Sequence, residues 1–236
     1  MGDTTHTVDT GTGAGTVIFD GAIQSGDDGD NDVLVIKSGT GNVTITGVIG
    51  ASKEIGGLKI NDGSGTNTAS EGNAAILITG AIGNGGAGVI GDTIIGNATT
   101  GSVSFGGALY SFDGTTNTIT SVSGDNINVA VTAEFETAQD AISFVGGNIA
   151  LANNANLTVN SDGGIITIAG ISGVSAETVT INANDLTGGG GTTNEKVVLG
   201  NVGDSAHAEI NTVTVTGDDG ITLQGAIYTD GSAGAA

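Results

Sequence analysis

The chain has 236 residues, of which 45 are Gly, and it contains no Pro, no Cys, no Trp and a single Met. The absence of Cys excludes disulfides, thiol catalysis and cysteine-ligated metal sites together. Four Lys and Arg against 25 Asp and Glu give a net charge of -21, which would repel the phosphates of nucleic acids and of anionic lipids, so no nucleic-acid partner is expected.

The N-terminal residues 1–15 precede the first clear strand pattern, and we expect them to form a flexible segment. They contain neither the basic nor the apolar region of a signal peptide. Farther along, the uncharged run Gly72 to Gly91 is long enough to cross a bilayer, but it contains seven Gly and several polar residues. No membrane span is therefore expected.

The sharpest acidic cluster is GDDGDND, in which Asp28, Asp30 and Asp32 alternate directly before the apolar run Val33 to Ile36. Closely spaced carboxylates on a turn suit Ca²⁺, which takes six to eight oxygen ligands. The cluster partly resembles the Gly/Asp repeat of calcium-binding β-rolls, although a single copy cannot build their stacked half-sites. These three Asp are the candidate metal ligands, and a solvated acidic turn is the alternative.

A seven-residue pattern, apolar-x-apolar-x-Gly-x-apolar, recurs along the chain. Its copies start at Val17, Val43, Ile76, Val103 and Ile221, with looser ones at Ile142 and Ile166. Since alternate residues of a strand face opposite sides, the inward set is apolar, apolar, Gly, apolar. An inward Gly at a fixed position indicates that another backbone passes too close for a side chain, or that the strand bends.

Successive copies start 26, 33, 27, 39, 24 and 55 residues apart, and between them lie apolar strands that end in Asn, Asp or Gly. A constant motif at a drifting, coil-like spacing predicts an all-β parallel β-helix (β-solenoid), with an antiparallel β-sandwich as the alternative. The solenoid should be one domain over residues 16–230, followed by a short tail at 231–236. Its third repeat positions, Ile45, Ile78, Phe105, Ile168 and Leu223, are expected to line one inward column.

Helix is expected almost nowhere. The only candidate is Thr132 to Asp140, nine residues that could form a helical turn or a polar excursion. Elsewhere Gly, Thr, Ser and Asn are too dense to leave a helical window.

This alternation of Gly-containing strands with strands that end in Asn, Asp or Gly resembles the β-helical stalks of large bacterial surface proteins, the filamentous-haemagglutinin-like and autotransporter adhesins. The likeness covers Thr16 to Thr229 and lies in pattern and composition, without a diagnostic motif. It implies a non-catalytic, extracellular protein of the cell surface, either an adhesin stalk or a fibre subunit. A host-surface or glycan ligand would suit such a protein.

Two other functions remain open. Thr pairs at outward positions, namely Thr44/Thr46, Thr118/Thr120 and Thr178/Thr180, together with the triplet Thr212/Thr214/Thr216, could make a solenoid face that binds ice or glycan. Asp218 and Asp219 invite comparison with pectin-cleaving β-helix enzymes, but the chain has no Arg and its two His, His6 and His207, stand in contexts without catalytic partners. A polysaccharide-degrading enzyme is therefore the third functional hypothesis, and we expect that the chain is not an enzyme.

The terminal coils of a solenoid expose unpaired strand edges, which recruit further strands unless something blocks them. The chain has no Pro and few Lys to block them. End-to-end self-association is therefore expected.

Overall fold

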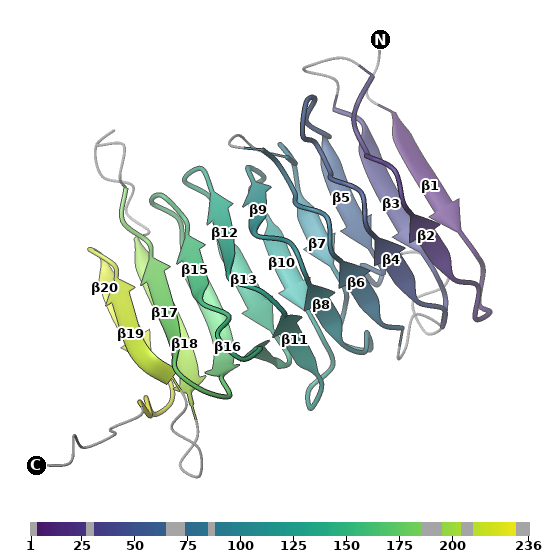
Figure 1. The fold of residues 1–236 in the computed structure, drawn as a ribbon. Coiled ribbons are helices and arrows are strands. Elements are labelled where there is room, and N and C mark those ends of the chain that lie inside the picture. The colour runs from purple at the N-terminus through teal and green to yellow at the C-terminus, as the bar shows by residue number, and fades with distance from the viewer. Residues whose placement is uncertain are drawn as a thin grey trace, which may run out of the picture.

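The computed structural model describes residues 4–26, 31–64, 74–84, 88–185, 195–203 and 210–229. These residues form twenty strands and no helix, arranged as a parallel β-solenoid of about eight turns. Figure 1 shows the strands stacked along one axis, from β1 at one end to β19 and β20 at the other. All pairings between these strands are parallel, which confirms the predicted β-helix and excludes the antiparallel sandwich.

Each complete coil contributes to three faces of the solenoid. The first face contains β1 (Thr5–Asp9), β3 (Val33–Lys37), β5 (Gly57–Ile60), β7 (Thr93–Ile95), β10 (Asn117–Thr120), β13 (Ile142–Val145) and β20 (Gly220–Leu223). The second face contains β2 (Val17–Phe19), β4 (Val43–Ile45), β6 (Ile76–Ile78), β8 (Val103–Phe105), β11 (Asn126–Val129) and β14 (Asn148–Leu151). The longer strands β16 (Ile166–Ser172) and β18 (Lys196–Val202) continue from the first face into the second.

The third face is a separate sheet of five strands: β9 (Leu109–Phe112), β12 (Ala133–Thr137), β15 (Leu157–Asn160), β17 (Glu177–Asn182) and β19 (Ile210–Thr216). Before β9, the described coils are joined on this side by single bridges, such as Ile23 to Ile49 and Ile49 to Ile82. Among the described residues, the third sheet therefore begins with the fourth coil.

The inward side chains form columns because each strand lies in register on the one before it. One column of the second face runs through Ile45, Ile78 and Phe105. Ile168 and Leu223 lie instead in a column of the first face, joined through Leu199. The prediction of one common column is therefore wrong. The repeated pattern indicates which side chains of a strand point inward, but it does not indicate on which face of the solenoid the strand lies.

The predicted inward orientation holds for the interior coils. Ile45, Ile78, Phe105 and Ile168 are buried, whereas Leu223 is 51% exposed. Leu223 lies on β20, the last strand of its face, and no following coil covers it among the described residues.

Aromatic side chains from all three faces meet in the middle coils. The ring centroids of Phe105 and Phe135 are 5.0 Å apart, those of Tyr110 and Phe135 are 4.8 Å apart, and those of Phe135 and Phe144 are 5.1 Å apart. The Tyr110 hydroxyl accepts a hydrogen bond from the Gly107 N–H and donates one to the Ile78 carbonyl. Burial raises the pKa of Tyr110 to about 12. The cluster thus ties the three faces together without leaving this hydroxyl unpaired.

Two segments differ from the sequence expectation. Thr132 to Asp140 is neither a helical turn nor an excursion, since it contains β12, in which Ala133, Phe135 and Thr137 point inward. The sequence predicts a flexible segment over residues 1–15, yet β1 lies within it and pairs with β3 from Thr5 to Asp9. The domain division itself stays a prediction.

The recurrent Gly marks a close approach between successive coils. A Cβ at Gly47 would lie closer than 3.0 Å to the Gly21 carbonyl oxygen, and one at Gly80 would crowd the Gly47 carbonyl in the same way. Neither residue has a positive φ, so the requirement is space and not backbone conformation. At Gly21, in the first coil, a Cβ would meet nothing within 4 Å.

This contrast predicts different effects for one substitution at two equivalent places. Gly47→Ala should destabilise the protein by about 1–3 kcal/mol, because the added methyl forces two coils apart. Gly21→Ala is the matched control and should change the free energy of unfolding far less. Urea unfolding followed by circular dichroism measures both, and equal losses would contradict the close-approach explanation.

Candidate functional site

The predicted calcium cluster is only partly visible. Asp28 and Asp30 lie outside the described residues, whereas Asp32 is described and lies just before β3. Its Oδ1 accepts a hydrogen bond from the Thr4 N–H at 3.1 Å and lies 3.8 Å from His6 Nε2. Asp32 therefore attaches its loop to the N-terminal strand, and within the described ranges no group of three or more acidic or His residues is placed to hold a metal.

Asp218 and Asp219 lie in the turn between β19 and β20. Asp218 Oδ1 accepts a hydrogen bond from Asn184 Nδ2 at 2.8 Å, and Asp219 Oδ2 accepts one from the Glu195 N–H at 3.2 Å. Burial, followed by the nearby Asp218, Asp219 and Asp185 carboxylates, raises the pKa of Glu195. Glu195 is the neighbour that sequence reasoning missed, because it precedes Asp218 by a full coil. His207, the other residue considered for catalysis, lies outside the described residues.

These carboxylates hold the backbone of neighbouring coils. Besides accepting from Glu195, Asp219 donates its own N–H to the Glu195 carbonyl at 3.2 Å. Glu195 is 6% exposed, which leaves its side chain little access to a substrate. The hydrogen bonds of Asp218 and Asp219 therefore account for a stable corner between two coils.

A second buried carboxylate, which the sequence analysis did not single out, is Glu177 at the start of β17. It accepts hydrogen bonds from the backbone N–H groups of Asn154, Val174 and Ser175, and from the Ser175 hydroxyl. Burial alone would raise its pKa, but these hydrogen bonds outweigh burial and lower it. Glu177 thus anchors the corner between the second and third faces in two successive coils.

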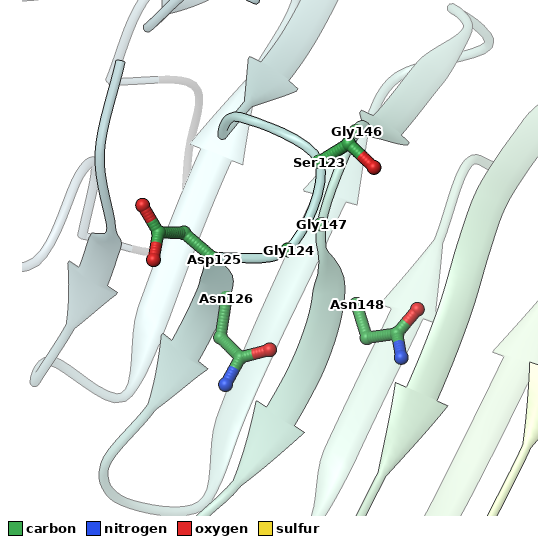
Figure 2. A pocket seen from close by; sticks show the side chains of 7 residues that line it. All are labelled: Ser123, Gly124, Asp125, Asn126, Gly146, Gly147 and Asn148. Carbon is green, nitrogen blue, oxygen red and sulfur yellow. The ribbon is translucent and has the colours of Figure 1, made fainter. Parts of the chain in front are cut away.

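The polar hollow in Figure 2 lies at the corner between the first and second faces. It is lined by Ser123, Gly124, Asp125, Asn126, Gly146, Gly147 and Asn148. In Figure 2 the Asp125 carboxylate and the Asn126 and Asn148 amides point in different directions. Because these groups do not converge on one point, the hollow has the form of a glycine-lined corner and not of a reaction centre.

The outer surface of the third face carries a regular array of uncharged polar side chains, which we call the hydroxyl grid. Its rows across β15, β17 and β19 are Asn156, Thr178 and Thr212; Thr158, Thr180 and Thr214; and Asn160, Asn182 and Thr216. The six Thr hydroxyls form no hydrogen bond with any described residue. The uncharged area is confined to β15, β17 and β19, because two of its rows continue on β12 as Glu134 and Glu136.

The Thr pairs singled out in the sequence do not share one face. Thr178/Thr180 and Thr212/Thr214/Thr216 belong to the grid, whereas Thr118/Thr120 lie on the first face and Thr44 lies on the second. The sequence identified the residue type but could not assign it to a face.

The pKa shifts predict how stability depends on pH. Burial, reinforced at three of these groups by neighbouring carboxylates, raises the pKa of Asp113, Glu134, Asp140 and Glu195, so each folded-state pKa lies above the unfolded one. Ionisation of these groups opposes folding, so stability should rise as the pH falls through their raised pKa values toward the ordinary values of 3.8 for Asp and 4.5 for Glu. Glu177 acts in the opposite direction, because the stability it adds is present above its ordinary pKa of 4.5 and is lost as the pH falls through its lowered pKa.

We therefore expect the melting temperature to pass through a maximum in mildly acidic buffer and to decline below it. Thermal melts at a series of pH values measure this. In Glu177→Gln the decline on the acidic side should be shallower, and a melting temperature that only falls from neutral to acidic pH would contradict the assignment.

The calcium hypothesis for Asp28, Asp30 and Asp32 stays a prediction. If Ca²⁺ binds the folded chain, stability must rise with its concentration. The melting temperature in millimolar Ca²⁺ should then exceed that in EDTA, and Asp30→Asn should remove the difference. Equal melting temperatures would leave the solvated acidic turn as the explanation.

The chain matches none of the family models, curated proteins or solved structures with which it was compared. The part of the resemblance that the fold itself bears out is the β-helical repeat region. The described residues also contain no helix long and apolar enough to cross a membrane.

Proposed function

We propose that the chain is a non-catalytic structural or adhesive segment of an extracellular bacterial surface protein, serving as a stalk or as a fibre subunit. The observation that carries this proposal is the single apolar core, which continues from coil to coil through most of the described solenoid. Val43, Ile76, Val103, Ile127 and Ile149, for example, are all fully buried in one column of the second face.

The hydrogen bonds of the described carboxylates support the same structural role. The carboxylates of Asp32, Glu177 and Asp219 all accept hydrogen bonds from backbone N–H groups. Backbone-bound carboxylates stabilise corners and leave few groups for chemistry on a substrate. A high negative charge also suits surroundings rich in salt or divalent cations, which screen carboxylates from one another.

The location can be tested on intact cells that produce the chain. External protease should remove the antibody signal for the chain while a cytoplasmic marker in the same cells stays intact. A signal that is lost only after the cells are lysed would overturn the surface assignment.

The hydroxyl grid favours a second function, a face that binds ice or glycan. Its side chains repeat at about 4.8 Å between strands and at about 6.7 Å along each strand, because the backbone fixes both spacings. Thr is stiff at χ1, so its hydroxyl and methyl groups are held in place. None of the grid's side chains is aromatic, which removes the usual stacking surface for a sugar ring and favours ice.

Substitution within the grid tests this second function. Thr180→Lys should abolish inhibition of ice recrystallisation, or binding to a glycan array, because it places a long charged chain at the centre of the grid. Thr118→Lys on the first face is the matched control, since both Thr are outward and half-buried. An unsubstituted protein with neither activity would overturn the proposal.

A further inference from the structure

We propose that the C-terminal end of one copy binds the N-terminal end of a second copy, so that β1 of the second copy continues the first face directly after β20. This inference rests on the structural role proposed above and names the partner as another copy of the same chain. The two ends lie at opposite extremes of the solenoid in Figure 1, so one copy can use both at once.

The C-terminal end exposes side chains that belong to the core. Ile221, Leu223 and Ile227 are 45%, 51% and 38% exposed. Their partners one coil earlier, Val197, Leu199 and Val202, are fully buried. The difference arises because β20 and Ile227 cover these partners, whereas no described strand covers Ile221, Leu223 and Ile227. A further coil at this end would bury three aliphatic side chains, which is favourable in water.

The N-terminal end offers strands with a free edge. Among the described strands, β1 pairs only with β3 and β2 pairs only with β4. Each therefore has a second edge of backbone N–H and C=O groups that can pair with another strand. Beside these edges lies a hollow that is lined by the apolar Phe19, Ile23 and Leu34 and by polar residues that include His6 and Asp32.

The two ends match in face, direction and register. Both β1 and β20 belong to the first face, where neighbouring strands are parallel. His6 and Val8 occupy the same two inward columns as Ile221 and Leu223, as the successive pairings along the first face establish. Stacking would therefore place Val8 on Leu223 and His6 on Ile221, and the columns would continue across the joint.

The contact uses different surfaces on the two copies, so it is heterologous. Each added copy leaves a new open end, and an open filament follows when the rotation between copies does not close into a ring. The opposing force is the charge of -21 on each copy. Because salt screens such repulsion, assembly should strengthen with ionic strength.

Two substitutions that each block one end test the proposal. Leu223→Asp introduces a charge at the C-terminal end, and Val8→Asp does so at the N-terminal end. Val174→Asp is the matched control for Leu223→Asp, since Val174 is 56% exposed in the turn between β16 and β17 and belongs to neither end. Circular dichroism melts establish that each variant is folded, and His6→Lys, whose side chain is 61% exposed, replaces Val8→Asp if that variant unfolds.

Sedimentation velocity and electron microscopy in about 0.5 M salt, where charge repulsion is screened, provide the readout. The unsubstituted chain and Val174→Asp should form linear assemblies. Leu223→Asp and Val8→Asp should each need more than about tenfold higher concentration to assemble, which corresponds to about 1.4 kcal/mol per joint. Mixed in equal amounts, the two blocked variants should form dimers and stop there, because each supplies the end that the other has lost.

Several results would overturn the inference. These are a strictly monomeric unsubstituted chain at high concentration and salt, an equal loss of assembly in Val174→Asp, or a mixture that forms long filaments or no dimers. A chain that stays monomeric but is removed from cells by external protease would retain the stalk role without stacking. Assembly by a chain that protease cannot reach would retain stacking and overturn the surface role.

Discussion

The structure depends on one constraint, the parallel ladder in which each coil must lie about 4.8 Å from the last with its residues in register. Because of this spacing, side chains at equivalent positions of successive coils point the same way, inward or outward. Ile76 therefore lies on Val43, and Val103 lies on Ile76. It also leaves no room for a side chain where the backbone turns a corner, as at Gly47. The Gly content and the aliphatic columns are thus two results of one repeat distance.

The same constraint explains what the sequence could and could not predict. Alternation along a strand is local, so the solenoid, the inward set and the close approach at Gly could be inferred from short patterns. The face on which a strand lies depends on how many residues fill the preceding corners, and the similar motifs at Val43 and Ile166 consequently came to lie on different faces. The Thr pairs show the same limit of sequence-based prediction. Only the register between β15, β17 and β19 brings some of these Thr residues together in the hydroxyl grid.

Contacts across coils were the other part that the sequence could not supply. In the sequence, nothing distinguishes Glu177 from other acidic residues at the start of a strand. In the structure its carboxylate is buried and accepts a hydrogen bond from the Asn154 N–H in the preceding coil. Glu195 meets Asp219 only because a whole coil lies between them. A carboxylate that accepts backbone N–H groups in this way carries no local signature, since its donors are residues of many types. These contacts between coils could therefore not be predicted from the sequence, whereas the fold could.

The aromatic cluster of the middle coils has a consequence for the order in which the chain folds. In a repeat protein each unit contacts mainly its neighbours, so folding can begin at the locally most stable unit and spread in both directions. Phe105, Tyr110, Phe135 and Phe144 join three successive coils there, whereas the earlier coils are held on their third side by single bridges. Backbone amides of β8, β12 and β13 should consequently exchange with deuterium most slowly, and the coil of β1 and β2 should open first. The strand edge that would receive a second copy thus lies on the coil most readily rearranged, which allows a joint to adjust as it forms.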